Sequence, residues 1–146
     1  MISIITSIRF INKFLTYQIH LIPKLTPHHI GIVVPKISES ISEIQILPFE
    51  EINAPETISS QKVKVVFLKI GTIFFELIEP IGEDSPVKNF AKQGGGIHHI
   101  CFEVDDIKIS LNYLKNKGAK IIVNPVEGYK GRLVAFVFLN LKNTNF

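Results

Sequence analysis

The sequence contains a single cysteine, Cys101, which excludes a framework of disulfides and is typical of a protein from a reducing compartment. It also lacks a long apolar run. Near the N-terminus, Arg9 and Lys13 interrupt the apolar residues, so this stretch is too broken for a membrane-spanning helix. The 146 residues fit one domain or two small halves with a shared core, and an apolar fraction of 46% is enough to build that core.

Acidic residues are missing from the first 38 positions. Residues 1–24 combine Ile, Phe and Leu with hydroxyl-bearing residues and with the cations Arg9, Lys13 and Lys24, a composition typical of a mitochondrial transit segment. The alternative is an isoleucine-rich strand that belongs to the fold. We predict a transit segment over residues 1–24, a location in the mitochondrial matrix, and a folded domain over residues 25–146.

The net charge of +3 comes from that segment. Without residues 1–24 the chain holds 13 basic and 13 acidic residues, so the remaining domain is neutral. A neutral domain has no electrostatic support for binding nucleic acid. We therefore expect neither a nucleic acid nor a membrane as a partner.

One phrase occurs twice, seventy positions apart. His28-His29-Ile30 and His98-His99-Ile100 are each followed by a Val six residues after the first His and by an Ile three residues later. Such a repeat indicates that one supersecondary unit is used twice. Each copy has the pattern of a strand, a helix and further strands, which predicts an α+β fold of two paired modules.

The first copy opens with a β-branched run that predicts a strand ending at Pro35. Alternation along a strand places His29 on one face, and it places His28 and His98 on the opposite face of their strands, which makes them weaker candidates for a site. A helix is expected over residues 38–47 with Ser38 as its N-cap. A hairpin of residues 63–70 and 72–79 is expected to turn at Gly71.

Between the copies, Ser85 and Pro86 predict the N-cap and first residue of a helix that ends near Lys92. Three glycines follow without a Gly-Lys-Ser/Thr motif, so we interpret them as a joint and not as a phosphate loop. In the second copy, Asp106 is expected to cap a helix that Gly118 ends. Module one is thus predicted over residues 27–81, a linker helix over 85–93, and module two over 96–146.

His29, Glu76 and His99 form the constellation with the clearest chemistry. The two histidines are equivalent in the repeat, and Glu76 lies among large apolar residues of its strand, where a carboxylate is costly unless it is at an edge, hydrogen-bonded or bound to a cation. Imidazole and carboxylate ligands suit zinc, cobalt, manganese or iron. The alternatives are structural histidines and an exposed sheet face for Glu76. No local signature supports a serine or cysteine nucleophile.

Several segments resemble the methylmalonyl-CoA epimerases of the vicinal-oxygen-chelate (glyoxalase-like) superfamily, namely His28–Pro35, Val63–Leu68, Phe75–Pro80, Gly82–Val87 and Gly96–Ile107. The resemblance implies paired βαβββ modules around one divalent metal, cobalt above zinc or manganese, with His29, Glu76 and His99 as three of its ligands. It also implies a homodimer. The implied reaction interconverts the (R) and (S) forms of methylmalonyl-CoA by removal and return of the C2 proton through a metal-stabilised enolate.

The sequence departs from that family at three places. Most importantly, the family ends in a strand of Gly-Val-Leu-Ile-Glu-Leu type whose Glu is both a ligand and a base, whereas this chain runs Leu141–Phe146 without it. We therefore expect module two to lack its last strand, which leaves an open sheet edge and removes a ligand and a proton-transfer group. The first helix differs at Glu43-Ile44 and Pro48-Phe49, and Lys62 stands where a glycine is usual.

Taken together, these features predict a mitochondrial methylmalonyl-CoA epimerase in which the proton-transfer residues are left unassigned and no organic cofactor is bound. Two alternatives stay open. One is another enzyme of the superfamily, a lactoylglutathione lyase or a ring-cleaving dioxygenase. The other is a non-catalytic protein that binds a metal or an acyl-CoA, which the absent Glu favours.

Overall fold

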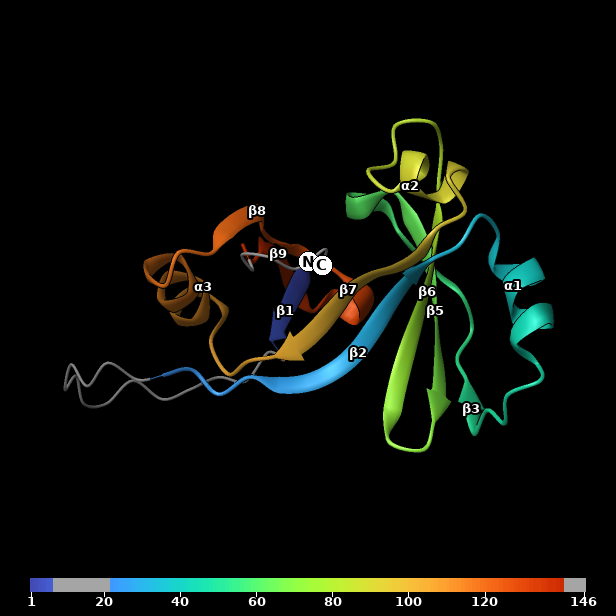
Figure 1. Cartoon of the computed structure of the whole chain (residues 1–146), viewed down its shortest axis with the longest axis horizontal. Helices are drawn as coiled ribbons and strands as arrows, with labels where there is room; N and C mark the ends of the chain where they lie inside the picture. The colour runs from blue at the N-terminus through green and yellow to red at the C-terminus, as the bar shows by residue number, and fades with distance from the viewer. Residues whose placement is uncertain (7–21, 141–146) are drawn as a thin grey trace.

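The computed structural model describes residues 1–6 and 22–140. These residues form one mixed sheet, flanked by helices (Figure 1). The strands are β1 (Ile2–Thr6), β2 (Thr26–Val33), β3 (Glu51–Ile52), β4 (Glu56–Ile58), β5 (Val63–Ile70), β6 (Ile73–Pro80), β7 (Gly96–Glu103), β8 (Lys120–Glu127) and β9 (Leu133–Phe138). The helices are α1 (Ile37–Ile44), α2 (Lys88–Lys92) and α3 (Ile107–Asn116), with single 3₁₀ turns at Ser59–Gln61 and Tyr129–Gly131. Within this part of the chain, no helix is long and apolar enough to cross a membrane.

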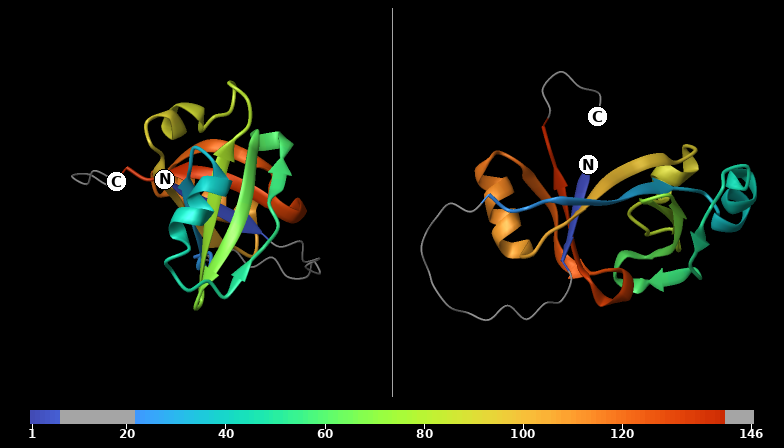
Figure 2. Two further views of the ribbon diagram at one scale, coloured as in Figure 1. Left: turned by 90° about the vertical axis from the view of Figure 1, so that its right-hand side faces the viewer. Right: turned by 90° about the horizontal axis from the view of Figure 1, so that it is seen from below.

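The sheet is built from two modules, as the repeat predicts. Its strand order is β3-β5-β6-β2-β7-β1-β9-β8, with β4 paired to β5. In module one β2 runs parallel to β6, and in module two β7 runs parallel to β1, while the antiparallel pair of β2 and β7 joins the modules at the centre. The sheet is curled, so that its inner face is concave (Figure 2). The predicted α+β fold of paired modules is confirmed.

The expected open position in module two is filled. β1 lies between β7 and β9, pairing parallel with the first and antiparallel with the second, just as β6 lies between β2 and β5 in module one. The prediction of an open sheet edge was therefore wrong, because a strand from the N-terminal end of the chain takes that position. Residues 141–146, on which the expectation of a missing strand rested, lie outside the described residues.

The predicted transit segment covers residues that belong in part to this sheet. Ile2–Thr6 form β1, the arrangement expected of the alternative reading as a strand of the fold. Residues 7–21 lie outside the described part of the chain. The transit segment stays a prediction, and its removal at residue 24 would take β1 out of the sheet.

Each module packs its helix against the outer face of its own half of the sheet. In module one α1 covers a buried cluster that contains Leu77 of β6. In module two α3 covers a corresponding cluster that contains Ile4 of β1. Leu77 and Ile4 are both fully buried, so β1 contributes to the core as β6 does. The alternate residues of these strands face the inner, concave side of the sheet, where Ser3 and Glu76 line a cavity.

Two of the predicted helix starts were wrong. The helix α1 begins at Ile37, and its first free backbone N–H is bound by the Glu79 carboxylate, with Ile37 N donating to Oε2 at 2.8 Å. Ser38 is therefore inside the helix and does not cap it, because a carboxylate from β6 already occupies that place. Ser85 does not cap α2 either, since that helix begins later, at Lys88. Asp106 caps α3 as predicted and accepts a hydrogen bond from Ile109 N at 2.9 Å.

The hairpin of module one agrees with the prediction. β5 and β6 pair along their whole length and turn at Gly71, which has a φ of +58°, a conformation that glycine adopts without strain. Lys62, where the resemblance leads us to expect a glycine, also adopts a left-handed φ of +53°. Its ammonium group is paired with Asp84, just before β5 begins.

Candidate metal centre

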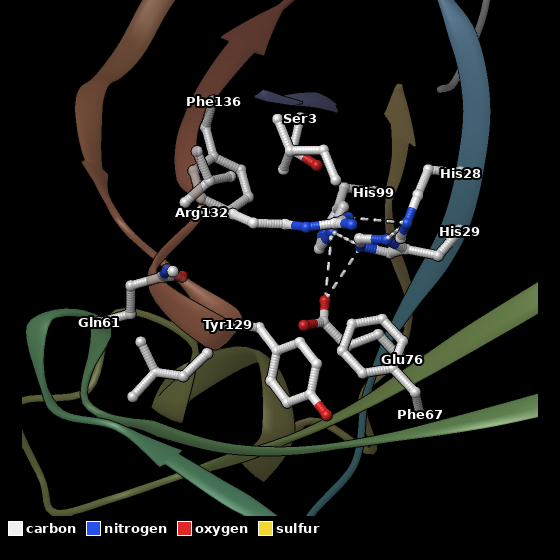
Figure 3. A pocket seen from close by; sticks show the side chains of 14 residues that line it. Ser3, His28, His29, Gln61, Phe67, Glu76, His99, Tyr129, Arg132 and Phe136 are labelled. Atoms are coloured by element: carbon white, nitrogen blue, oxygen red, sulfur yellow. Dashed lines mark hydrogen bonds and ion pairs between the residues drawn. The ribbon is translucent and has the colours of Figure 1, made fainter. Parts of the chain in front are cut away.

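The structure brings His29, Glu76 and His99 together on the inner face of the sheet (Figure 3). His29 Nε2 lies 3.2 Å from Glu76 Oε2 and 3.4 Å from His99 Nε2. The third distance, from His99 Nε2 to Glu76 Oε2, is 3.6 Å. The three side chains come from neighbouring strands β2, β6 and β7, so the sheet fixes their spacing without help from loops.

All three side chains are buried, with exposed fractions of 7% for His29, 8% for Glu76 and 3% for His99. A buried carboxylate is stable only when a cation or several donors face it. Here burial alone lowers the pKa of His29, but its contacts with Cys101 and with the Glu76 carboxylate outweigh burial and raise that pKa to about 9. Burial and the positive charge of His29 lower the pKa of His99 to about 2. Without an ion, the protonated ring of His29 therefore pairs with the Glu76 carboxylate.

The first histidine of each pair also approaches the site, contrary to the prediction that it points to the other face. Pairing between β2 and β7 shifts register twice, once between Pro27 and His29 and once beside Gly31. The extra residue is His28 in the first bulge and His98 in the second. A bulge turns its extra residue toward the side of its neighbour, so simple alternation fails at both places.

Each of these bulge histidines contacts the imidazole of the next residue. His28 Nδ1 lies 2.8 Å from His29 Nδ1, and His98 Nδ1 lies 3.1 Å from His99 Nδ1. Burial lowers the pKa of both His28 and His98, which keeps their rings neutral partners. Contacts of this kind orient a ligating imidazole and leave its Nε2 to face the metal position.

Aromatic rings hold the two inner imidazoles in place. The ring of Phe67 packs edge-on against that of His29, with 5.2 Å between the ring centroids. The ring of Phe136 packs in the same way against that of His99, with 5.3 Å between the centroids. On the other side, the His99 ring lies over Gly31, where an added Cβ would come within 2.3 Å of it. Any side chain at residue 31 would therefore displace His99 from the cluster.

The cluster lines a small cavity of about 50 Å³. That space is enough for an ion with a few small ligands. Its wall also includes side chains that sequence reasoning did not single out, among them Ser3, Gln61, Tyr129 and Arg132. Arg132 donates from Nη1 to His28 Nε2 at 3.1 Å, so a positive charge lies beside the histidines. No local pattern marks these residues, because they reach the site from separate strands and turns.

A second, larger cavity of about 380 Å³ adjoins the cluster. Glu76 and His99 line both spaces, together with Gln61 and Phe136. The rest of its wall is mainly apolar and comes from β5, β8 and the segment before α2. A volume of this size matches a site for a small organic ligand, and it opens onto the same Glu76 carboxylate that faces the histidines.

The donor set fits a divalent cation. Two ligand atoms bound to one ion at 2.0–2.1 Å in tetrahedral geometry lie about 3.4 Å apart, and the three distances of the cluster fall between 3.2 and 3.6 Å. Two neutral imidazoles and a carboxylate are also the ligands that zinc, cobalt and similar ions accept. One ion can therefore contact all three side chains without a movement of the backbone.

Comparison with known proteins gives a family match. The model of the Glyoxalase/Bleomycin resistance protein/Dioxygenase superfamily matches residues 28–136. The ethylmalonyl-CoA/methylmalonyl-CoA epimerase of Cereibacter sphaeroides is 33% identical over 114 residues, which cover 75% of this chain and 85% of that protein. The mitochondrial methylmalonyl-CoA epimerase of Dictyostelium discoideum is 35% identical over 121 residues, which cover 81% of this chain and 72% of that protein.

A solved structure has the same fold. A methylmalonyl-CoA epimerase in complex with methylmalonyl-CoA and NH4⁺ superposes with a TM-score of 0.69 at 30% sequence identity. The superposition covers 79% of this chain and 86% of that one. The matched region of the family model begins at His28, so β1 lies outside it.

Proposed function

Because the chain belongs to the Glyoxalase/Bleomycin resistance protein/Dioxygenase superfamily and resembles its methylmalonyl-CoA epimerases over most of its length, we propose that it interconverts the two C2 epimers of methylmalonyl-CoA. The observation that carries the proposal is the buried cluster of His29, Glu76 and His99, whose ligand atoms have the spacing of a three-ligand metal site. His29, Glu76 and His99 would hold a divalent ion, which would supply positive charge for the thioester oxygen as C2 loses its proton.

The protein's own residues account for binding and orientation. The larger cavity gives an apolar wall and ends at Glu76 and His99, so an acyl-CoA thioester that enters it reaches the metal position directly. Arg132 brings a guanidinium into the small cavity, next to His28. A guanidinium binds a carboxylate in a fixed geometry, which suits the free carboxylate of a methylmalonyl group. Water is largely excluded, since the three ligands are buried.

Solvent exchange tests this function directly. Methylmalonyl-CoA incubated with the cobalt-loaded protein in deuterium oxide should acquire deuterium at C2, because an epimerase returns a proton that has equilibrated with solvent. A metal-free sample is the control. Exchange no faster than in that control would contradict the enzyme proposal.

The ligand assignment has its own test. His99→Ala should lose most of its cobalt binding while it keeps the fold, because the neighbouring core residue Cys101 and the outer cluster around α3 are untouched. Elemental analysis gives the metal content, and circular dichroism checks the fold. Unchanged metal content in His99→Ala would remove His99 from the ligand set.

A second candidate is a protein of the same superfamily that binds a metal or an acyl-CoA without catalysis. The presence of Ser3, not a carboxylate, in the wall of the cavity favours it, since a hydroxyl is a poor general base. Tight acyl-CoA binding without exchange at C2 would support this candidate. A lactoylglutathione lyase activity is separated from both by a panel of thioester and hemithioacetal substrates.

Cobalt as the ion, a homodimer and a mitochondrial matrix location complete the proposal. The mitochondrial relative in Dictyostelium and the acid-free N-terminal composition support the location. A reporter fused to residues 1–30 should enter mitochondria, and N-terminal sequencing of the mature protein shows whether β1 is retained. Metal replacement with zinc and manganese ranks the ions by exchange rate, and sedimentation measures the oligomeric state.

A further inference from the structure

Strand pairing places Ser3 and Glu76 at equivalent positions of the two modules. In module one, Glu76 of β6 lies directly opposite Phe67 of β5. In module two, Ser3 of β1 lies directly opposite Phe136 of β9. These phenylalanines are the two rings that stack edge-on against the inner histidine of their own module, so the equivalence extends to the side chains.

The parallel partners give the same alignment. Glu76 pairs with Gly31 of β2, and Ser3 pairs with Cys101 of β7. Gly31 and Cys101 each come two residues after the inner histidine of their strand. The two independent pairings of β1 therefore agree that residue 3 corresponds to residue 76.

The strand ends confirm the register. Val34 N donates to Ile78 O at 2.9 Å in module one, and Val104 N donates to Ile5 O at 2.8 Å in module two. Ile78 and Ile5 come two residues after Glu76 and Ser3. In each module the same hydrogen bond thus joins the strand to the residue three positions before the helix.

Ser3 is also an unexplained polar group. Its exposed fraction is 1%, and its Oγ has no hydrogen-bond partner among the described residues. A buried hydroxyl without a partner has given up its hydrogen bonds to water without replacement, so such a group points to something that binds there. Ser3 lines the same small cavity as the three candidate ligands (Figure 3).

We propose that Ser3 occupies the position of a fourth ligand in the metal site. The symmetry of the two modules would place the counterpart of the Glu76 carboxylate there. This inference rests on the proposed metal site. It means that β1, a strand outside the matched family region, completes the site and not only the sheet. With Glu76 as the single anionic ligand, a bound divalent ion leaves the site with one net positive charge, which favours an anionic oxygen ligand from outside the chain.

The proposal predicts a gain of affinity from a single substitution. Ser3→Glu places a carboxylate where the symmetry mate of Glu76 belongs, and Ser3→Asp is a shorter version that fits a tighter space. Either variant should bind Co²⁺ at least about tenfold more tightly than the natural sequence, since even partners outside the ligand set change metal affinity ten- to a hundredfold. Titration calorimetry on the full chain measures the affinity, and the visible spectrum of Co²⁺ reports a change of its ligands.

Matched variants separate ligation from packing. Ser3→Gln has the size of Ser3→Glu without its charge, and Ser3→Ala removes the hydroxyl alone. Neither should gain cobalt affinity. The proposal is overturned if the carboxylate variants bind no more tightly than Ser3→Gln, and also if both carboxylate variants fail to fold in the presence of cobalt, because an ion in that site would neutralise their charge.

The outcomes distinguish this inference from the proposed function. If the natural protein binds cobalt and the carboxylate variants bind it no better, only the role of Ser3 fails. If a carboxylate variant binds cobalt and the natural protein does not, the role of Ser3 stands and the metal-dependent function of the natural chain fails. If none of them binds cobalt, both fail.

Discussion

The two modules share a backbone and differ in how they complete it. Both have a strand with a histidine bulge, a helix on the outer face and a phenylalanine against the inner histidine. Module one draws its strands β2 to β6 from one continuous segment, whereas module two takes β7, β8 and β9 from one part of the chain and β1 from another. At the equivalent inward position, module one has Glu76 and module two has Ser3.

This difference shows that a position in a sheet is easier to fill than a position in a metal site. A gap in a sheet accepts any extended segment whose apolar residues alternate correctly, and Ile2–Thr6 meets that requirement with Ile4 outward and Ser3 and Ile5 inward. A metal ligand must instead be one of a few side chains. The sheet of module two is therefore complete, while the inward position equivalent to Glu76 holds a hydroxyl, Ser3, and not a carboxylate.

The largest expected effect tests whether the modules contribute unequally to metal binding. Glu76→Gln keeps the size of the side chain and removes its charge, so cobalt affinity should fall more than about a hundredfold, beyond the effect of a partner outside the ligand set. Ser3→Ala, at the equivalent position, should change it far less. Titration calorimetry compares the two variants. Equal losses would mean that the modules contribute equally.

Next in size is a test of whether β1 packs as firmly as β6. Leu77→Ala and Ile4→Ala each remove a fully buried side chain from an outer core, and each should lower the free energy of unfolding by about 2–5 kcal/mol. Ile73→Ala, at a half-exposed position, is the control and should cost about 0.5 kcal/mol. Urea unfolding gives the three values. A negligible cost for Ile4→Ala would show that β1 is not part of the stable fold.

A smaller effect tests the two bulge histidines. His28→Ala and His98→Ala should each weaken cobalt binding ten- to a hundredfold, about 1.4–2.7 kcal/mol, because each removes the partner that orients an inner imidazole. Competition with a chelator measures the loss. Different losses in the two variants would identify the contact of His28 with Arg132 as an additional constraint in module one.

The smallest effect concerns the helix starts. Glu79→Ala removes the carboxylate that binds Ile37 N in module one, and Asp106→Ala removes the local cap of α3 in module two. Each should cost about 1 kcal/mol of stability, read from thermal unfolding. Asp105→Ala, next to the cap but without the capping bond, serves as the control. A clear loss in that control would assign the effect to surface charge and not to capping.

Local patterns were sufficient where neighbours in the sequence are also neighbours in space. The hairpin of β5 and β6 turns at Gly71 as predicted, and Asp106 caps α3 three residues before the N–H that it binds. They failed where a distant residue competes. At the start of α1 the backbone N–H of Ile37 is bound by Glu79, 42 positions later in the chain, and not by the predicted cap Ser38. The bulges at His28 and His98 also arise from the pairing of two distant strands.

The sequence by itself determined that one unit is used twice and that His29 and His99 hold equivalent places in it, because repetition is visible along the chain, whereas Glu76 joined them only as a carboxylate in an apolar strand and through the family resemblance. The tertiary structure decided that Ile2–Thr6 completes module two and that Ser3, His28 and Arg132 reach the same cavity. The physical reason is that strand register is a long-range property. It depends on which backbone groups find partners in the finished sheet, and no local period specifies that choice.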